Sequence, residues 1–556
     1  MMDRQGGLGW SIAIALVAVA SWTGCTDGGG SDSGTAEHLD DNTQIAQATL
    51  EYTSADEDST VDDQLQIAEA DDNIHVDGTL YASQDGIRKA IALTHMVKGL
   101  KHGLTMYHQD TIRREPEEYG DPLVEAEFAP EQEEEQQQAQ PEEVDPEIRA
   151  AGIDEVRRTR DMVAQEAARP GSGSLAQEVE LLDQLIANMQ QGGTAPVMYE
   201  PSAEAAADGF GGGGAAPGAG GQLGATPGGA QDIGYLRRLI EEGMVPAPDH
   251  FEAEGLFSEH DLPLEAEACE QMLCISAAHG FGPDFVDGGQ TGFIQIGFAS
   301  GLDAATFERK PLNLSVVIDR SGSMSGDRIE AARTALERLV DQLSPNDRLS
   351  LVVFNNEPQV MLEPTMVNDP NAIKSLVRGL EAEGGTDIES GLRQGFAFVD
   401  AHRSSAPEME HRVILITDAQ PNIGATGDSE FVELAQDHAQ RGIGLTTMGV
   451  GVDFGHALAL AIGRVRGANM LYLEDAEKLE RVFDQDFEYL VTPLAYDLRL
   501  DVRPEQGFRI RDVHGIANWD DSTGMLTLDI PTVFVSRNKG AIVIELEVMG
   551  GSGNPL

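Results

Sequence analysis

Residues 314–324 read Leu-Ser-Val-Val-Ile-Asp-Arg-Ser-Gly-Ser-Met, an apolar run joined directly to a polar cluster. An apolar run of this length that ends in a turn predicts a buried strand. Asp319, Ser321 and Ser323 then lie at the carboxyl end of that strand, which is where open α/β sheets place their ligand sites. All three side chains offer oxygen, the ligand atom that hard cations such as Mg²⁺ prefer. The segment therefore predicts a metal site at the edge of a sheet.

Two later segments supply the remaining candidate ligands, Thr386 and Asp418. The first, residues 384–387, reads Gly-Gly-Thr-Asp, and the second, residues 414–422, reads Ile-Leu-Ile-Thr-Asp-Ala-Gln-Pro-Asn. The three segments in this order resemble the metal-ion-dependent adhesion site of von Willebrand factor type A domains. That family usually has glycine after the last aspartate, where this chain has Ala419. The alternative is that these residues only form turns.

The resemblance implies a doubly wound, mostly parallel α/β sheet of the Rossmann-like kind, with a site for Mg²⁺, or for Mn²⁺ or Ca²⁺ in its place. In such a site Ser321, Ser323 and Thr386 provide hydroxyl oxygens, while Asp319 and Asp418 supply charge directly or through water. Mostly neutral ligands leave the cation with residual positive charge. An exposed Asp or Glu of a protein partner would then take the open position, replacing one water.

Residues 312–490 alternate short apolar runs, such as 349–354 and 413–416, with helical patterns. Alternation of this kind predicts a parallel sheet that helices cover on both faces. We place this α/β domain at residues 305–492. His438 lies on the apolar face of one predicted helix, and we interpret it as a packed core residue rather than a ligand.

The sequence pattern changes to a period of two after Pro493, so residues 493–556 are predicted to form an antiparallel β-sandwich-like module. This module has few strands for its length. The segment before the α/β domain, residues 232–304, contains one more alternating run at 293–298. We therefore predict that the α/β domain is inserted into a β-sandwich, in which 293–298 pairs with the later strands. Both connections would leave the α/β sheet on the side opposite the metal.

Composition limits how much of the chain can fold. The 556 residues carry a formal net charge of −58, include 62 glycines and are only 5% aromatic. Residues 26–231 are acidic and Gly-rich, and we predict a largely disordered tether. Helical patterns at 87–106 and 175–189 are interpreted as spaced helices on a flexible stalk rather than as a folded domain. The charge argues against nucleic acid as a partner, because phosphate contacts need basic surfaces.

Residues 1–25 resemble a bacterial lipoprotein signal peptide. The apolar core at 11–20 is too short to span a bilayer, and Trp-Thr-Gly follows before Cys25. The resemblance makes Cys25 the lipidated mature N-terminus, and Thr26 after it favours the outer membrane, if there is one. We therefore expect a lipid-anchored, extracytoplasmic protein of the bacterial cell envelope. The alternative is an ordinary signal peptide with a chance cysteine.

Cys269 and Cys274 stand in one short stretch. Because an exported chain permits disulfides, we predict that these two cysteines pair with each other. Free thiols or a metal site are the alternatives, although the nearest histidine, His279, does not complete a zinc set by itself.

Two kinds of function remain. The first is a surface-anchored module for adhesion or complex assembly, which grips an acidic partner residue through the metal. The second is a metal-dependent hydrolase, or a regulatory subunit of an export complex linked to an ATPase. An enzyme needs a general base near the metal; Asp387 is the closest candidate by position, and a helix N-cap explains it more simply. We therefore expect a binding protein rather than an enzyme.

Overall fold

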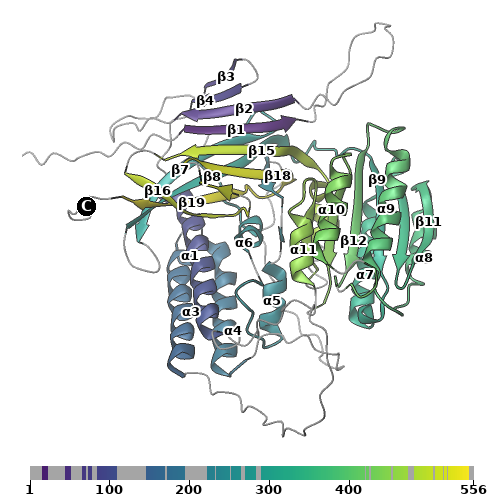
Figure 1. Cartoon of the computed structure of the whole chain (residues 1–556), viewed down its shortest axis with the longest axis horizontal. Coiled ribbons are helices and arrows are strands. Elements are labelled where there is room, and N and C mark those ends of the chain that lie inside the picture. The colour runs from purple at the N-terminus through teal and green to yellow at the C-terminus, as the bar shows by residue number, and fades with distance from the viewer. Residues whose placement is uncertain are drawn as a thin grey trace, which may run out of the picture.

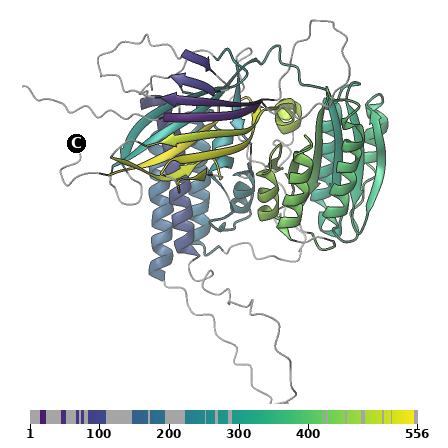
Figure 2. The same cartoon turned by 45° about the horizontal axis from the view of Figure 1, so that its top comes forward.

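The computed structural model contains three neighbouring parts, namely an α/β domain, a large antiparallel sheet and a set of helices packed beside that sheet (Figure 1). Figure 2 shows the same three parts after a turn of 45°. The described residues are 84–108, 146–169, 172–193, 222–228, 230–231, 233–250, 252–264, 269–283, 290–419, 421–424, 427–451, 455–473, 481–504, 507–517, 519–522 and 524–549, with the strand backbone of 15–22, 44–51, 66–70 and 73–77.

The α/β domain contains a seven-stranded sheet in the order β11-β10-β9-β12-β13-β14-β6. All neighbouring strands are parallel except the edge strand β11, which runs antiparallel to β10. The doubly wound, mostly parallel sheet predicted from the alternating pattern is therefore confirmed. Its strands are β6 (Ala230–Gln231), β9 (Leu312–Asp319), β10 (Arg348–Phe354), β11 (Pro358–Met366), β12 (Glu410–Thr417), β13 (Gly444–Gly449) and β14 (Asn469–Tyr472).

Helices cover both faces of this sheet. Alternate side chains along β9 point to opposite faces and enter two different cores. Leu314, Val316 and Ile318 pack with α7 and α8, whereas Val317 packs with α9, α10 and α11. Continuous apolar strands of this kind are typical of a sheet that is buried on both sides. The helices and short helical segments are η2 (Gly322–Met324), α7 (Asp327–Gln342), α8 (Pro370–Val377), α9 (Ile388–Arg403), α10 (Asp428–Ala439), α11 (His456–Gly463), η3 (Arg481–Asp486) and α13 (Phe487–Leu490).

The second sheet is built from strands on both sides of the α/β domain. β8 pairs antiparallel with β19, and Ile294 and Ile296 lie opposite Ile544 and Ile542. The predicted pairing of residues 293–298 with later strands is therefore confirmed. The strands are β5 (Gln222–Pro227), β7 (Cys274–Pro283), β8 (Gln290–Asp303), β15 (Pro493–Arg503), β16 (Phe508–His514), β17 (Trp519–Asp520), β18 (Leu526–Ser536) and β19 (Ala541–Val548).

The hydrogen bonds of this sheet differ from the predicted sandwich. They join the strands into one twelve-stranded sheet. β5 pairs with both β8 and β18, and so links one half of the sheet, formed by β16, β19, β8 and β7, to the other half, which begins with β18 and β15. The two halves still share one apolar core, in which Ile294 and Ile296 of β8 meet Leu498 and Leu500 of β15. Beyond β15 the sheet continues through β1 (Ala15–Trp22), β2 (Gln44–Glu51), β4 (Asn73–Asp77) and β3 (Gln66–Ala70).

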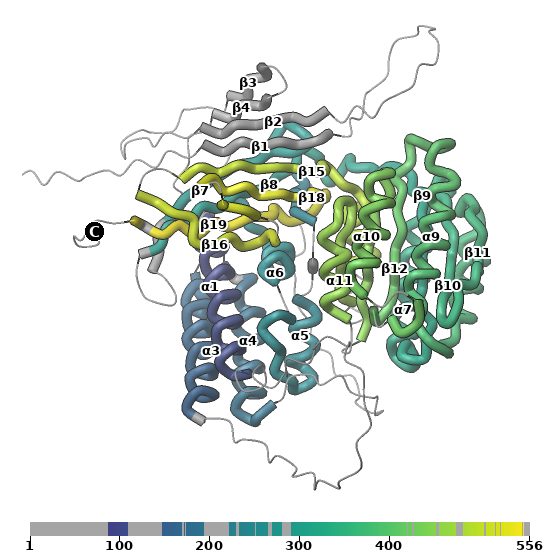
Figure 3. Tube along the Cα trace, in the orientation of Figure 1, coloured from purple at the N-terminus to yellow at the C-terminus, as the bar shows by residue number. Residues whose placement is uncertain are grey.

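The helices packed beside the sheet correct the prediction of a flexible stalk. Apolar side chains of α1, α3 and α4 share a buried core with α5 and α6, and Phe293 and Val543 of the sheet belong to the same core. Figure 3 shows α1, α3 and α4 side by side below the sheet. These elements are α1 (Gln84–Tyr107), α3 (Pro146–Ala167), η1 (Gly173–Leu175), α4 (Ala176–Gln190), α5 (Ile233–Glu241) and α6 (Ala253–Glu259).

Two glycines explain how closely α1 and α3 approach. A Cβ atom at Gly103 would lie 3.0 Å from the Gly152 carbonyl oxygen, and one at Gly152 would lie 2.6 Å from the Gly103 carbonyl oxygen. The two helix backbones therefore touch at this point, which a larger residue would prevent. The rest of the predicted tether, in 26–231, lies mostly outside the described residues.

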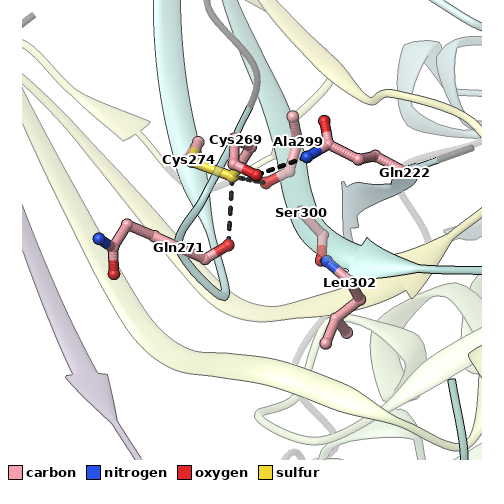
Figure 4. The surroundings of a disulfide bond; sticks show 7 residues. All are labelled: Gln222, Cys269, Gln271, Cys274, Ala299, Ser300 and Leu302. Atoms are coloured by element: carbon pink, nitrogen blue, oxygen red, sulfur yellow. Dashed lines mark hydrogen bonds between the residues drawn. A yellow bond between two sulfur atoms is a disulfide. The ribbon is translucent and has the colours of Figure 1, made fainter. Parts of the chain in front are cut away.

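A disulfide joins Cys274, the first residue of β7, to Cys269, five residues before it (Figure 4). The amide of Gln222 donates a hydrogen bond of 2.6 Å to the carbonyl oxygen of Cys269, which ties this loop to β5. The free-thiol and metal alternatives are therefore wrong in this structure. Among the described residues, no three His, Cys, Asp or Glu side chains gather as a metal-binding group.

The main stretch of the α/β domain, residues 312–490, begins and ends opposite the carboxyl ends of its parallel strands, whereas β6 joins the sheet separately, between β5 and α5. The chain enters at Leu312, the first residue of β9, and leaves after α13, where the Leu490 carbonyl accepts a hydrogen bond of 3.1 Å from Asn469 at the start of β14. Of the predicted targeting segment, residues 15–22 fall in β1 and Cys25 lies outside the described residues. Within the described part of the chain, no helix is long and apolar enough to cross a membrane.

Candidate metal centre

The five residues predicted as ligands lie on three loops at the carboxyl edge of the α/β sheet. Asp319 ends β9, Ser321 and Ser323 follow it, Thr386 lies before α9, and Asp418 follows β12. β9 and β12 are direct neighbours in the sheet, so their carboxyl ends meet. Four of the five side chains are buried, and only Ser323 is half-exposed.

Hydrogen bonds fix the carboxylate of Asp319. The Ser321 backbone N–H donates to its Oδ1 atom at 2.8 Å, and the Thr417 hydroxyl donates to its Oδ2 atom at 2.6 Å. Thr417 comes from the neighbouring strand β12, so the two strand ends are joined through this carboxylate. The role of Thr417 is not evident from the motif, although its position directly before Asp418 places it at the same edge.

The loops that carry the hydroxyl groups are bonded to one another. The hydroxyl oxygens of Ser321 and Ser323 lie 3.0 Å apart. The Gly322 N–H donates to the Gly384 carbonyl at 2.9 Å, which holds the Ser321 loop against the loop of Thr386. The structure therefore brings the first two motif segments into direct contact.

Asn422 joins the third motif segment to the loop of Thr386, and the sequence did not identify it as a site residue. Its Oδ1 atom accepts a hydrogen bond of 2.8 Å from the Thr386 N–H, and its Nδ2 atom donates to the Thr386 hydroxyl at 3.4 Å. Asn422 therefore orients Thr386 from the loop after β12. Its place in the quoted segment, four residues after Asp418, was the available signal.

The two carboxylates repel each other in a buried setting. Burial first, and then the negative charge of Asp418, raise the pKa of Asp319 to about 7, despite hydrogen bonds from Ser321 and Thr417. Both carboxylates are fully buried. Two buried carboxylates placed so closely require a compensating positive charge if both are to be ionised.

Arg328 is a further residue of this site that the sequence pattern did not indicate. Its Nη1 atom donates to the carbonyl oxygen of Ser323 at 2.9 Å and lies 3.4 Å from Oδ2 of Asp418. This side chain starts from the first turn of α7 and so connects the first and third motif segments.

The backbone after Asp418 adopts the geometry that glycine favours. Ala419 has φ of 54°, and its N–H donates to the Thr417 hydroxyl at 2.8 Å. The departure from glycine therefore leaves the loop geometry intact but places an alanine in the left-handed region.

Asp387 serves as the N-cap of α9. Its Oδ1 atom accepts a hydrogen bond of 3.0 Å from the Ser390 N–H, and its Oδ2 atom accepts one of 2.6 Å from the Ser390 hydroxyl. The helix-capping interpretation of this residue is confirmed, and the carboxylate that the sequence offered as a general base is engaged in the cap.

The donor set fits a small, hard divalent cation. Every candidate ligand atom is an oxygen, and the set combines three hydroxyls with two carboxylates. Adjacent ligands of an octahedral Mg²⁺ ion are about 3 Å apart, because each lies about 2.1 Å from the metal. The separation of 3.0 Å between the Ser321 and Ser323 hydroxyls matches that spacing.

The family model of the von Willebrand factor type A domain matches residues 314–420 of the chain. This range begins within β9 and ends just after Asp418, so it contains all five candidate ligands. It covers the part of the chain that carries the candidate ligands.

Relatives with similar sequences match about half of the chain or less. An uncharacterised protein of Synechocystis sp. is 29% identical over 258 residues, which is 46% of this chain and 58% of that protein. The human inter-alpha-trypsin inhibitor heavy chain H4 is 32% identical over 153 residues, 26% of this chain and 16% of its own length. The uncharacterised protein YfbK of Escherichia coli is 22% identical over 274 residues, 48% of this chain and 47% of its own. The chain thus spans less than two thirds of each relative.

Solved structures resemble the chain at low identity. A von Willebrand factor type A protein from Catenulispora acidiphila has a TM-score of 0.35 and 16% identity, and the match covers 52% of this chain and 68% of that protein. The pilus adhesin SpaC from Lactobacillus rhamnosus GG has a TM-score of 0.29 and 14% identity, covering 49% of this chain and 43% of that protein.

Proposed function

We propose that the von Willebrand factor type A domain of this chain is a metal-dependent protein-binding module, which grips a carboxylate of a protein partner through the site at Asp319. The observation that carries this proposal is the buried all-oxygen donor set, in which two carboxylates and three hydroxyls converge at one edge of the sheet. The family match supports the proposal, because it covers the segments that supply these oxygens.

Each residue of the site would have a distinct role in holding the cation. Ser321, Ser323 and Thr386 would offer neutral hydroxyl oxygens, and Asp319 and Asp418 would supply charge. A bound divalent cation would contribute an electrophilic centre that attracts a carboxylate of the partner. Thr417 and the backbone of the Ser321 loop hold Asp319 in one orientation before any cation arrives. Preorganisation of this kind reduces the entropic cost of binding.

The position of the site suits an encounter with another protein. Ser323 is half-exposed, and Gly322 and Asn422 beside it are exposed. The connections at residues 312 and 490 lie at the opposite end of the strands, near Asn469. A partner could therefore approach the site without meeting the antiparallel sheet.

Calorimetry with Mg²⁺ and Mn²⁺ on the full chain tests the metal. We expect binding by the wild type, no binding by Asp319→Ala, and affinity reduced at least about tenfold by Ser321→Ala. Ser325→Ala is the matched control, because its exposed hydroxyl binds the Gly322 carbonyl and is not among the candidate ligands. Equal binding by wild type and Asp319→Ala would reject the site.

Capture of partners in Mg²⁺ and in EDTA tests the binding role. We expect proteins that are retained by the wild type in Mg²⁺, released by EDTA and not retained by Asp319→Ala. Retention that is unchanged by EDTA and by the substitution would show that binding does not use this site.

We also propose that Cys25 anchors the chain in a bacterial envelope membrane, with the outer membrane favoured; cleavage before Cys25 would remove strand β1 from the mature chain. The support is the apolar run followed by Trp-Thr-Gly before Cys25. Lipidation with more than one acyl chain would give stable attachment, which a single chain does not. Cell fractionation should find the wild type with membranes and Cys25→Ser in the soluble fraction, and a mature chain that begins elsewhere than Cys25 would refute the anchor.

A further inference from the structure

The guanidinium group of Arg328 lies inside the candidate metal centre. Its Nη1 atom is 3.4 Å from Oδ2 of the buried Asp418 and 2.9 Å from the carbonyl oxygen of Ser323. The Asp418 side chain is 0% exposed and that of Arg328 is 19% exposed, so solvent screens this ion pair only weakly. A positive charge of the protein therefore occupies a site that is otherwise lined by oxygen.

The surrounding backbone is shaped to admit this side chain. Gly451, in the loop after β13, has φ of 83°, and a Cβ atom there would lie 2.3 Å from Nε and 2.9 Å from Cδ of Arg328. A residue with a side chain at 451 would therefore collide with the arginine. Arg328 therefore lies against three loops, namely those of Ser323, Asp418 and Gly451.

We infer that Arg328 is a resident counter-charge, which neutralises Asp418, holds the metal affinity down and leaves a bound cation with excess positive charge for the carboxylate of a partner. This inference rests on the proposed metal-dependent function. The formal charges of the site show why. The charges of Asp319, Asp418 and Arg328 sum to −1, and a divalent cation brings the total to +1. Without the arginine the same sum is zero, and a neutral centre attracts a carboxylate less strongly.

The inference makes opposite predictions for two measurements. Loss of the guanidinium charge should strengthen binding of the metal, because one repulsive charge is removed from the site. The same loss should weaken binding of a carboxylate to the loaded site. A purely structural role for Arg328, such as holding the start of α7, predicts weaker binding in both measurements.

The experiment compares three variants of the full chain. Arg328→Gln removes the charge, Arg328→Lys retains it, and Arg338→Gln is the control, because Arg338 lies ten residues further along α7 and pairs with Asp484 away from the site. Calorimetry with Mg²⁺ alone should show about tenfold tighter binding for Arg328→Gln. Arg328→Lys and Arg338→Gln should stay within about threefold of the wild type.

A second measurement uses acetate as the carboxylate probe. Acetate that displaces water from protein-bound Mn²⁺ lowers the relaxivity of the water protons, so titration gives an apparent affinity for the carboxylate. We expect a several-fold weaker acetate affinity for Arg328→Gln than for the wild type, with Arg328→Lys close to the wild type.

The outcomes separate this inference from the proposed function. Arg328→Gln must first match the wild type in circular dichroism and in melting in EDTA. If its Mg²⁺ affinity is then unchanged or weaker, the counter-charge role of Arg328 is overturned. Absence of metal binding by the wild type overturns the proposed function as well. If Arg328→Gln does not fold, Arg328→Met, which keeps the aliphatic stem, answers the same question.

Discussion

At the scale of single residues, the backbone at the metal centre carries a local strain. Ala419 has φ of 54°, in the left-handed region that costs a residue with a side chain about 1–2 kcal/mol. Neighbouring contacts hold it there: the Gly455 N–H donates to the Asp418 carbonyl at 2.7 Å, and a Cβ at Gly455 would lie 1.9 Å from the Ala419 carbonyl oxygen. The loop is therefore so tightly packed that Gly455 cannot change, while position 419 tolerates an alanine.

Gly384 allows a sharper prediction, because it lies two residues before Thr386. It has φ of 85°, and a Cβ there would lie 3.1 Å from Nδ2 of Asn355. Gly384→Ala should lower the free energy of unfolding by about 1 kcal/mol and shift the loop of Thr386. We expect the Mg²⁺ affinity to fall about tenfold, since a displaced ligand loop weakens a metal site. Urea unfolding and calorimetry measure the two effects.

Gly442 provides the control for this prediction. It has φ of 77° after α10, and a Cβ there would meet no atom within 4 Å. Gly442→Ala should therefore cost a similar backbone strain of about 1 kcal/mol while leaving Mg²⁺ affinity unchanged. Equal metal affinities in the two variants would show that Gly384 does not position the ligand loop.

At the scale of elements, α9 and α10 are joined by a histidine that the sequence predicted to be a core residue. His438 of α10 is 9% exposed, and its ring stacks on Phe396 of α9 with centroids 4.0 Å apart. Burial, and then the positive charge of Arg441, lower the pKa of His438 to about 4. The core interpretation is therefore confirmed, and the neutral imidazole is part of the packing.

This histidine should make stability depend on pH. Its folded pKa of about 4 lies below the ordinary value of 6.5, so the unfolded chain binds the proton more readily between these values. The stabilisation is complete above pH 6.5 and is lost as the pH falls towards 4. We expect His438 to account for a loss on the order of 1–2 kcal/mol over that window, allowing for partial screening by solvent.

Urea unfolding at several pH values between 7 and 4 measures this slope. His438→Gln cannot titrate, so its free energy of unfolding should fall less steeply than that of the wild type over the same window. His102 of α1, whose side chain is exposed, is the control, and His102→Gln should leave the slope nearly unchanged. Parallel slopes for His438→Gln and the wild type would contradict the assignment.

The elements also show which parts of the fold could be predicted. The alternating apolar runs predicted the parallel sheet, and the period-two segment at 293–298 predicted its antiparallel pairing with the later strands, because both patterns are local. The position of Asn422 in the third motif segment was a signal, but its hydrogen bonds to Thr386 could not be predicted, since they depend on the approach of two loops. The short strand β6 could not be predicted either, because two residues carry no periodicity. The motif identified candidate ligands and gave no indication of Arg328, whose contact with Asp418 spans ninety residues.

At the scale of the whole molecule, α5 and α1 connect the parts. In α5, Leu236 and Ile240 enter the core shared with α1, whereas Tyr235 and Leu239 enter the core of the α/β domain. In α1, Lys98 reaches the antiparallel sheet and pairs with Glu545 of β19. The helices therefore brace the sheet and the α/β domain together. Composition could not predict these packed helices, because the Gly-rich and acidic segments between them dominate the average composition of residues 26–231.

The ion pair between Lys98 and Glu545 permits a direct test of this arrangement. The Glu545 side chain is 0% exposed, and its oxygens lie 2.7 Å from Nζ of Lys98 and 3.0 Å from Nε2 of His514. Burial by itself raises the pKa of Glu545, but the hydrogen bond from His514 and the charge of Lys98 outweigh burial and hold the pKa below its usual value. Removal of Lys98 would leave a buried carboxylate without the charge of this lysine.

We therefore predict that Lys98→Met lowers the free energy of unfolding by about 3 kcal/mol, measured by urea denaturation at pH 7. Lys101, one turn further along α1, is the matched control, because its pair with Glu252 is 3.0 Å long but has side chains that are 36% and 28% exposed. Lys101→Met should cost less than about 1 kcal/mol, since exposed pairs contribute little. In Lys98→Met/Glu545→Gln most of the loss should be recovered, because the buried charge is then absent. If both lysine substitutions had equally small effects, α1 would not be packed on the sheet, and the helices would be the flexible stalk that composition suggests.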